Sequence, residues 1–252
     1  MRLKEKVIIV TGAAAGLGEA MATGFVAEGA TVICGDIDRK RLEKSIEKMD
    51  GPGEAIPIFV DVSDESSVDQ MIRVSEELGG ADILINNAGV KQLTLTGEEH
   101  QIIEMSTDLW DEIINTNLRG CFLCTKAVLP GMMERKRGRI IHVTSGHGKK
   151  GRVKRAAYVS SKFGCEGFHW TLSLELVDTP VESLVFTPPP GGVRTQEAAF
   201  VEDPLRDMNH DPEVIIEPMI KLAAGGGRNG GRYRGGSDGR SYEETDYIFN
   251  LK

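Results

Sequence analysis

The sequence is poor in cysteine and tryptophan, with four and two respectively among 252 residues. Cys121 and Cys124 have the Cys-x-x-Cys spacing, but no second pair at similar spacing accompanies them, so we expect no metal site. Both lie in an apolar stretch with a helical pattern. We interpret all four cysteines as small, buried apolar side chains.

Long apolar runs are also missing. None reaches the ~18 residues that a membrane-spanning helix needs. The first residues, Met1 to Lys6, lead straight into a predicted strand and leave no room for a signal peptide. We therefore expect a soluble, cytoplasmic protein with no membrane partner.

Positive charge is not in excess, because 30 Lys and Arg face 38 Asp and Glu, a formal net charge of −8. An acidic chain disfavours non-specific binding to nucleic acid, so we expect no nucleic-acid partner. Hydrophobic residues make up 40% of the chain, enough for a substantial core. The length suits one large α/β domain or two small ones.

Short β-branched runs alternate with helical patterns along most of the chain. We predict strands at 7–10, 31–35, 55–60, 83–85, 139–144 and 181–186, and helices at 19–28, 39–49, 64–78, 107–129 and 156–177. Helices of ten or more residues between strands imply right-handed crossovers and a parallel sheet. The prediction is one doubly wound α/β domain over 1–252, with helices on both faces and ligands at the carboxyl ends of the strands.

A glycine-rich turn follows the first predicted strand and opens a helix. Gly12 permits the tight turn, while Gly16 and Gly18 remove side chains from the approach to the backbone. Backbone N–H groups at such a helix start bind a pyrophosphate, and we include Leu17 in this contact. A glycine-rich turn alone is a weak signal, but here it begins a βαβ unit, as a dinucleotide site requires.

Two acidic residues close the next strands. Asp36 can accept hydrogen bonds from both adenosine ribose hydroxyls and would repel a 2′-phosphate, so we predict NAD rather than NADP, with Ile37 beside it. Asp61 can accept from the adenine amino group while Val62 offers its backbone. Asp61 can equally cap the helix that follows Ser63, and the sequence leaves both interpretations open.

Four residues form a candidate catalytic group. A phenol keeps its proton at pH 7, but a cation stabilises the phenolate, and Lys162 lies one helical turn from Tyr158. Tyr158 can then exchange a proton with an alcohol or ketone as general acid or base. Ser145, at the end of the fifth strand, can hold the substrate oxygen. Asn117 is unfavourable inside a helix and, taken alone, is more often solvated or helix-bending than catalytic.

Together these motifs resemble the short-chain dehydrogenase/reductase family of the classical type, over nearly the whole chain. The matching segments are Thr11 to Gly18, Asn86 to Gly89, the tetrad of Asn117, Ser145, Tyr158 and Lys162, and Pro190 to Thr195. The resemblance implies a Rossmann fold of about seven strands. The closing strand would lie near 231–239.

The resemblance also implies roles for individual residues. It places Asn87, Ala88 and Gly89 at the adenosine ribose side of the cofactor and in support of the sheet. It implies that Lys162 binds the nicotinamide ribose and that Asn117 holds a water in a proton relay. Val193 and Thr195 would contact the nicotinamide carboxamide. Pro189 stands where the family usually has Asn, and the segment 90–110 is longer than usual.

The expected function is an NAD-dependent oxidoreductase that interconverts a secondary alcohol and a ketone. One alternative is a 3-oxoacyl-thioester reductase, although the family usually serves that role with NADP, and Asp36 argues against it. Another is a non-catalytic dinucleotide sensor, against which the intact tetrad argues.

Three further expectations concern a basic loop, a substrate lid and the subunit interface. Between Ser145 and Tyr158 lie six basic residues: His147, Lys149, Lys150, Arg152, Lys154 and Arg155. They indicate either an anionic substrate or a solvated or intersubunit loop. The segment 187–225 is predicted to form a substrate lid. The resemblance implies that the helices at 107–129 and 156–177 form the subunit interfaces of a homodimer or homotetramer.

Overall fold

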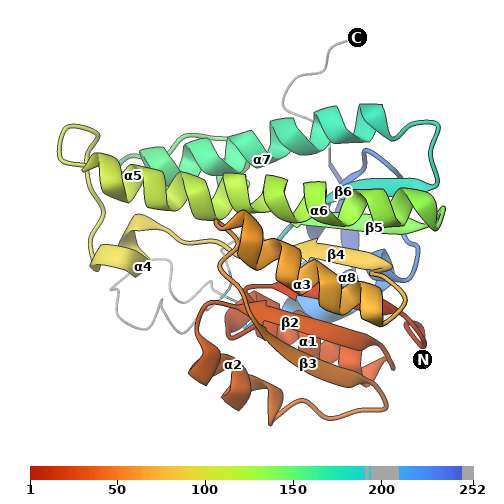
Figure 1. The fold of residues 1–252 in the computed structure, drawn as a ribbon. Coiled ribbons are helices and arrows are strands. Elements are labelled where there is room, and N and C mark those ends of the chain that lie inside the picture. The colour runs from red at the N-terminus through yellow and green to blue at the C-terminus, as the bar shows by residue number, and fades with distance from the viewer. Residues whose placement is uncertain (191–192, 194–209, 246–252) are drawn as a thin grey trace.

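The computed structural model describes residues 1–190, 193 and 210–245, and its strands form one eight-stranded sheet (Figure 1). The strand order is β3-β2-β1-β4-β5-β6-β7-β8. The strands are β1 Val7–Thr11, β2 Thr31–Asp36, β3 Glu54–Phe59, β4 Ile83–Asn86, β5 Gly138–Val143, β6 Val181–Thr187, β7 Arg232–Gly235 and β8 Tyr242–Glu244. All neighbouring strands are parallel except β7 and β8.

Helices cover both faces of the sheet and bury its β-branched strands. They are α1 Gly16–Ala27, α2 Arg39–Ile46, α3 Glu65–Glu77, α4 Gln92–Thr96, α5 Thr107–Ile114, α6 Gly120–Glu134, α7 Ala156–Glu175 and α8 Ile216–Ala223. One core includes Phe25 of α1 and Met219 of α8, and the other includes Met71 of α3 and Val128 of α6. Burial on both sides explains why central strands such as β1 and β4 are continuous apolar runs. Among the described helices, none is long and apolar enough to cross a membrane.

The strand order reverses between β1 and β4. The chain leaves β1 for β2 on one side and later enters β4 on the other, so the crossover segments diverge there. This switch point is where doubly wound sheets bind ligands, outside the carboxyl ends of the strands. The glycine turn follows β1 and the Asn86 to Gly89 segment follows β4, so both predicted motifs flank it.

The predicted fold class is confirmed, with strand boundaries within one residue of prediction for the first six strands. The predicted closing strand corresponds to β7, and β8 adds an antiparallel eighth strand that the sequence analysis did not predict. Its sequence Tyr242–Glu244 is short and mostly polar, which is typical of an edge strand.

The helix predicted at 107–129 is wrong in two respects. Helix α5 ends at Ile114, and a π-helix, Asn115–Arg119, separates it from α6. Helix α6 then continues to Glu134 through Pro130, where the prediction ended it, because Val128 and Met132 on either side are buried in the core. In Figure 1, α5 and α6 follow one another end to end alongside α7.

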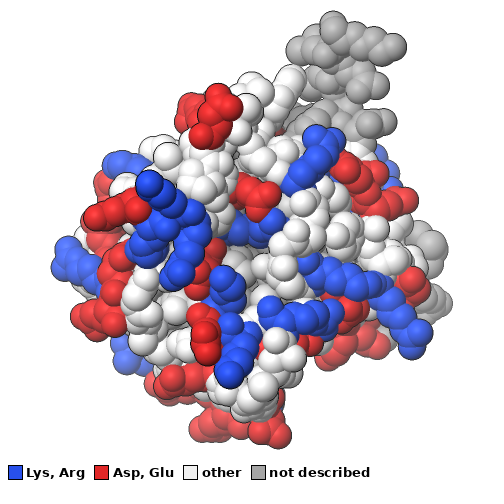
Figure 2. All heavy atoms as spheres, turned by 90° about the vertical axis from the view of Figure 1, so that its right-hand side faces the viewer, with Lys and Arg blue, Asp and Glu red and all other residues white. Residues whose placement is uncertain are grey.

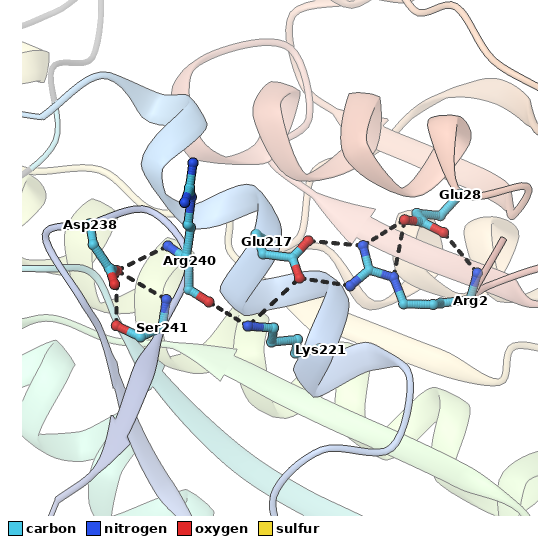
Figure 3. Close-up of polar contacts among 7 residues, drawn as sticks. All are labelled: Arg2, Glu28, Glu217, Lys221, Asp238, Arg240 and Ser241. Carbon is cyan, nitrogen blue, oxygen red and sulfur yellow. Dashed lines mark hydrogen bonds and ion pairs between the residues drawn. The ribbon is translucent and has the colours of Figure 1, made fainter.

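Charged side chains link the start of the chain to two helices (Figure 3). Arg2 binds Glu28 at the end of α1 and Glu217 on α8, at 2.6 and 2.7 Å. Lys221, one turn after Glu217, donates to the carbonyl oxygen of Arg240 in the turn between β7 and β8. Because Arg2 is 40% exposed, these contacts fix the chain start but add little stability.

Basic and acidic side chains are interspersed on the face that Figure 2 shows. At the amino ends of the strands, Arg137 pairs with Asp82 before β4, and Arg139 at the start of β5 pairs with Glu182 of β6. Charge at this end of the sheet is therefore paired locally.

Candidate active site

The glycine turn after β1 packs tightly against its own backbone and against the segment that follows β4. Gly12 has φ +69°, and a Cβ there would lie 2.9 Å from the Cα of Ala88. A Cβ at Gly18 would lie 1.9 Å from the carbonyl oxygen of Gly12, so this contact requires glycine. The residue before α1, Ala15, provides no side-chain cap. The N–H groups at this helix start are therefore available to an anion, which fits the pyrophosphate of a dinucleotide.

The Thr11 hydroxyl joins the ends of β1 and β4. Its oxygen accepts from the backbone N–H groups of Asn87 and Ala88, both at 3.0 Å, and donates to the carbonyl of Ile85. Asn87 returns a side-chain hydrogen bond of 2.8 Å to the carbonyl of Thr11. The implied role of Asn87 in supporting the sheet therefore has a structural basis. The sequence analysis included Thr11 in a motif but missed this function of its side chain.

Backbone N–H groups hold the carboxylate of Asp36 at the end of β2. One oxygen accepts from Ala14 and the other from Asp38, each at 2.9 Å. Each carboxylate oxygen has a second lone pair, so both can still accept from a ribose hydroxyl. Ile37 beside it is 61% exposed. The carboxylate is thus oriented before any cofactor binds.

Asp61 follows β3 and stabilises a local turn. Its Oδ1 accepts from the backbone N–H of Ser63 at 2.9 Å and from the Ser63 hydroxyl at 2.7 Å. The N-cap of α3 is Asp64 and not Asp61. Val62 is buried and lines the cavity described below. Contact of Asp61 and Val62 with adenine stays a prediction.

Asn117 lies in the π-helix and binds the backbone that follows β4. Its Oδ1 accepts from the N–H of Val90 at 2.7 Å, and its Nδ2 donates to the carbonyl of Val90 at 2.9 Å and to the Ser161 hydroxyl at 3.0 Å. Asn117 is 2% exposed, so it is neither solvated nor free. π-Helical turns frequently occur at functional sites, and here the turn carries the amide to this contact. Sequence reasoning missed Ser161.

Lys162 and Tyr158 lie on the same face of α7, as their spacing predicts. The Lys162 side chain is buried, and its Nζ donates to the carbonyl of Val143 at 3.1 Å and lies 5.8 Å from the centre of the Tyr158 ring. A Cβ placed at Gly89 would lie 3.1 Å from Oδ1 of Asn117 and 3.6 Å from Nζ of Lys162. The structure therefore brings Gly89, Asn117, Tyr158 and Lys162 together.

Ser145 begins a 3₁₀ turn directly after β5. Its Oγ lies 3.2 Å from Nδ1 of His147 and also accepts from the backbone N–H of His147 at 3.2 Å. The imidazole in turn contacts the edge of the Tyr158 ring, with 5.9 Å between ring centres. Burial, with a smaller contribution from nearby cations, lowers the pKa of His147 to about 4. In the sequence His147 is one of several basic residues, and nothing there indicates this contact.

A cavity lies between the carboxyl ends of β1, β4 and β5, the π-helix with the start of α6, and α7. Its lining includes Thr11, Val62, Ala88, Asn117 and Lys162, and also Cys121, Cys124 and Cys165. All four cysteines are buried and free, as predicted. Burial raises the pKa of Cys34 and of Cys124 to about 12. Within the described ranges, no group of three His, Cys, Asp or Glu residues could hold a metal ion.

The segment after β6 is only partly described. Val193 pairs with His210 in an isolated parallel bridge and packs against the core. Thr195 lies outside the described residues, as do all of 191–192 and 194–209 of the predicted lid at 187–225. The basic loop before α7 is described, and one of its cations, Arg155, forms an ion pair with Glu99.

Comparison with known proteins agrees with this geometry. Residues 6–204 match the family described as short chain dehydrogenase. A 3-oxoacyl-[acyl-carrier-protein] reductase, FabG, from Thermotoga maritima is 35% identical over 236 residues, which cover 89% of this chain and 92% of that protein. The chain belongs to the short-chain dehydrogenase family, whose members are oxidoreductases that bind a nicotinamide dinucleotide.

Two solved structures are also similar. The crystal structure of gox2181 has a TM-score of 0.79 and 28% identity, covering 88% of this chain and 90% of that one. A metagenomic short-chain oxidoreductase in complex with NADP has a TM-score of 0.76 and 27% identity, covering 89% and 93%.

Proposed function

We propose that the protein is an NAD-dependent oxidoreductase that interconverts a secondary alcohol and a ketone. The observation that carries this proposal is the convergence of Asn117, Ser145, Tyr158 and Lys162 next to the switch point of the sheet. A sensor that only bound a dinucleotide would need no such group, and this argues against the non-catalytic alternative.

Each residue of the group has a defined task in oxidation. The Tyr158 phenolate takes the hydroxyl proton of the alcohol while the adjacent carbon loses its hydride, and in reduction the phenol returns that proton. The ammonium of Lys162 stabilises the phenolate. The Ser145 hydroxyl donates to the substrate oxygen, and Asn117 fixes the backbone beside Lys162. A bound nicotinamide dinucleotide supplies the acceptor or donor of the hydride.

The cofactor would be held by elements on both sides of the switch point. The amides at the start of α1 receive the pyrophosphate, and Asp36 accepts from the adenosine ribose hydroxyls. The fixed carboxylate of Asp36 supports NAD, because it lies where the 2′-phosphate of NADP would introduce a second negative charge. The NADP complex of the similar metagenomic enzyme makes direct measurement of the cofactor preference necessary.

A second candidate is reduction of a 3-oxoacyl thioester. The name of the Thermotoga relative favours it, and so do the cations around the site. Arg155, Arg152, Lys150 and Lys91 all contribute to lowering the pKa of His147, which indicates a positive potential at the entrance. This potential supports an anionic substrate, although Arg155 is already paired with Glu99.

We also propose a homodimer or homotetramer built on α6 and α7. Phe122 on α6 is 45% exposed, Leu174 on α7 is 63% exposed, and Val177 just after α7 is 63% exposed. Apolar side chains on the outer faces of adjacent helices are typical of subunit interfaces. Sedimentation or light scattering of the purified protein tests this assembly.

The experiment that tests the function is an assay of reduced nicotinamide absorbance over a panel of secondary alcohols, ketones and 3-oxoacyl thioesters, with NAD(H) and NADP(H). We expect turnover of at least one neutral or anionic alcohol with NAD. A matched double variant, Lys150→Glu with Arg152→Glu, should weaken turnover of anionic substrates more than that of neutral ones. Turnover of thioesters alone, with NADPH, would favour the second candidate.

A further inference from the structure

His147 contacts the catalytic hydroxyl twice. Its backbone N–H donates to Oγ of Ser145, and its ring Nδ1 lies at hydrogen-bond distance from the same oxygen, with both separations 3.2 Å. The proposed reaction uses the hydroxyl of Ser145 but does not involve the side chain of His147. The two residues are joined by the 3₁₀ turn Gly146–Gly148, and Gly148 of that turn is buried against Glu166. The turn therefore holds the imidazole against Ser145.

The direction of the ring contact decides what Ser145 can do. A serine hydroxyl has one proton to donate and two lone pairs that accept. The backbone N–H of His147 already occupies one lone pair. If Nδ1 carries a hydrogen and donates it, the second lone pair is occupied as well. The Ser145 proton then has no acceptor in this turn and is left for the substrate oxygen.

The opposite tautomer would have the opposite effect. An imidazole with its hydrogen on Nε2 accepts at Nδ1, so Ser145 would donate its only proton to the ring. The substrate oxygen would then meet a lone pair of the serine instead of a donor. A donor is what a ketone oxygen needs, and what an alkoxide-like transition state needs even more.

We infer that His147 is a positioning residue that donates from Nδ1 to Ser145 and so directs the serine proton toward the substrate oxygen. This inference rests on the proposed oxidoreductase function, in which Ser145 holds that oxygen. His147 acts through Ser145 and is not itself a catalytic residue. Its ring also contacts Tyr158 edge-on, which limits its rotation and keeps Nδ1 turned to the serine.

The surroundings of the ring keep it neutral. Desolvation by burial is the largest cause of its lowered pKa, followed by the cations Arg155, Arg152, Lys150 and Lys91. With a pKa of about 4, the imidazole is uncharged throughout the neutral range, so its role depends on which nitrogen holds the hydrogen. A neutral ring also adds no charge beside the Tyr158 phenolate.

The kinetic test uses variants that differ in what they can donate. Asn at position 147 can place an N–H near the site of Nδ1, whereas Leu has similar size and no donor. His147→Phe keeps an aromatic edge against Tyr158 without a hydrogen bond. We expect His147→Asn to stay within about threefold of wild type in kcat, and His147→Leu and His147→Phe to fall about tenfold, the value of one hydrogen bond.

A double-mutant cycle with Ser145 separates positioning from other roles. In a Ser145→Ala background, His147→Leu should cause no further loss, because the hydroxyl that the ring orients is absent. Val153→Ala, at an 87% exposed position of the same loop, is the control and should leave kcat unchanged. Losses that multiply in the double variant, or equal losses for His147→Asn and His147→Leu, would overturn the inference.

A measurement without turnover decides the tautomer directly. Nitrogen-15 chemical shifts of His147, assigned with the His147→Asn variant, distinguish a hydrogen on Nδ1 from one on Nε2. We expect the hydrogen on Nδ1 in wild type and a changed tautomer ratio in Ser145→Ala. A hydrogen on Nε2 in wild type would refute the inference even in an active enzyme. An inactive wild type with the hydrogen on Nδ1 would refute the proposed function instead.

Discussion

Arg232 on β7 donates two hydrogen bonds of 2.8 Å to the carboxylate of Glu166 on α7, although Arg232 is only 1% exposed. The same carboxylate accepts from the hydroxyl of Thr144, the residue before Ser145, at 2.9 Å. Glu166 also lies one helical turn after Lys162. The buried pair of Arg232 and Glu166 therefore connects β7, the last parallel strand of the sheet, to the segment that carries Ser145 and to the helix that carries Lys162.

Replacing only Arg232 of this pair should lower the free energy of unfolding. Arg232→Met leaves the Glu166 carboxylate buried without its partner, which costs about 3–5 kcal/mol of unfolding free energy. Urea denaturation followed by circular dichroism measures this loss. Arg234→Met on the same strand is the control, because Arg234 pairs with Glu243 at 3.8 Å near the surface and should cost under about 1 kcal/mol. Equal losses would show that the buried pair has no special role.

Removal of the Asn117 amide should affect stability and turnover together. Asn117→Leu keeps the approximate volume but leaves the N–H and carbonyl of Val90 without their partners. The loss of these two hydrogen bonds and of the one to the Ser161 hydroxyl predicts about 3 kcal/mol of destabilisation. We expect kcat to fall by about 100-fold, because the backbone beside Lys162 is released. Asn115→Ala, exposed on the same π-helix, should leave kcat unchanged, and a similar fall there would count against the argument.

Acid should destabilise the fold through a buried histidine. Burial lowers the pKa of His169 to about 3, whereas in the unfolded chain it is near 6.5, so below pH 6.5 the unfolded chain binds the extra proton. The contribution of His169 to the free energy of unfolding is fully present above about pH 6.5 and decreases as the pH falls toward 3. Between about pH 7.5 and 5 the loss should be about 2 kcal/mol.

The matched variant for this prediction is His169→Asn, which cannot titrate but can still bond to the Ser183 hydroxyl, now 2.7 Å from the ring. Urea denaturation at several pH values should show a flatter pH dependence for this variant than for wild type. Parallel curves would mean that His169 is not the group responsible. His142 is also buried, with its pKa held well below its usual value, so some dependence will remain.

Asp36 should control the choice of cofactor. Charge repulsion at close range is worth a few kcal/mol, so wild type should favour NAD over NADP by more than about 100-fold in kcat/KM. Asp36→Ala should lower that ratio by at least about tenfold by raising kcat/KM for NADP. Glu43→Gln removes the same charge from an exposed position on α2 and should leave the ratio unchanged. A wild-type preference for NADP would contradict the assignment.

The parallel sheet could be predicted because its central strands are buried on both faces and are therefore continuous apolar runs in the sequence. Ile8 to Val10 and Ile83 to Ile85 have no polar alternation that would hide them. Motifs at the carboxyl ends of such strands meet at one edge by topology, so Gly12 and Asn87 could be placed together from the sequence.

Features that depend on distant contacts could not be predicted. The π-helix at Asn115–Arg119 accompanies bonds between Asn117 and Val90, 27 residues away, which local propensity does not record. The protonation state of His147 could not be predicted either. Its neighbours along the chain are basic, but partial burial beside Ser145 and Tyr158 lowers its pKa and keeps the imidazole neutral. Strand β8 lacks an apolar pattern because it lies at the sheet edge.

The proposed chemistry depends on the phenol of Tyr158, and the variant Tyr158→Phe tests it most directly. The variant removes a single oxygen and leaves the ring, its contact with His147 and the cofactor turn in place. We expect the Kd for NAD, measured by calorimetry, to stay within about threefold of wild type, while kcat for the best alcohol of the panel falls by at least about 1,000-fold. A variant that binds NAD and still oxidises the alcohol at the wild-type rate would contradict the proposed chemistry.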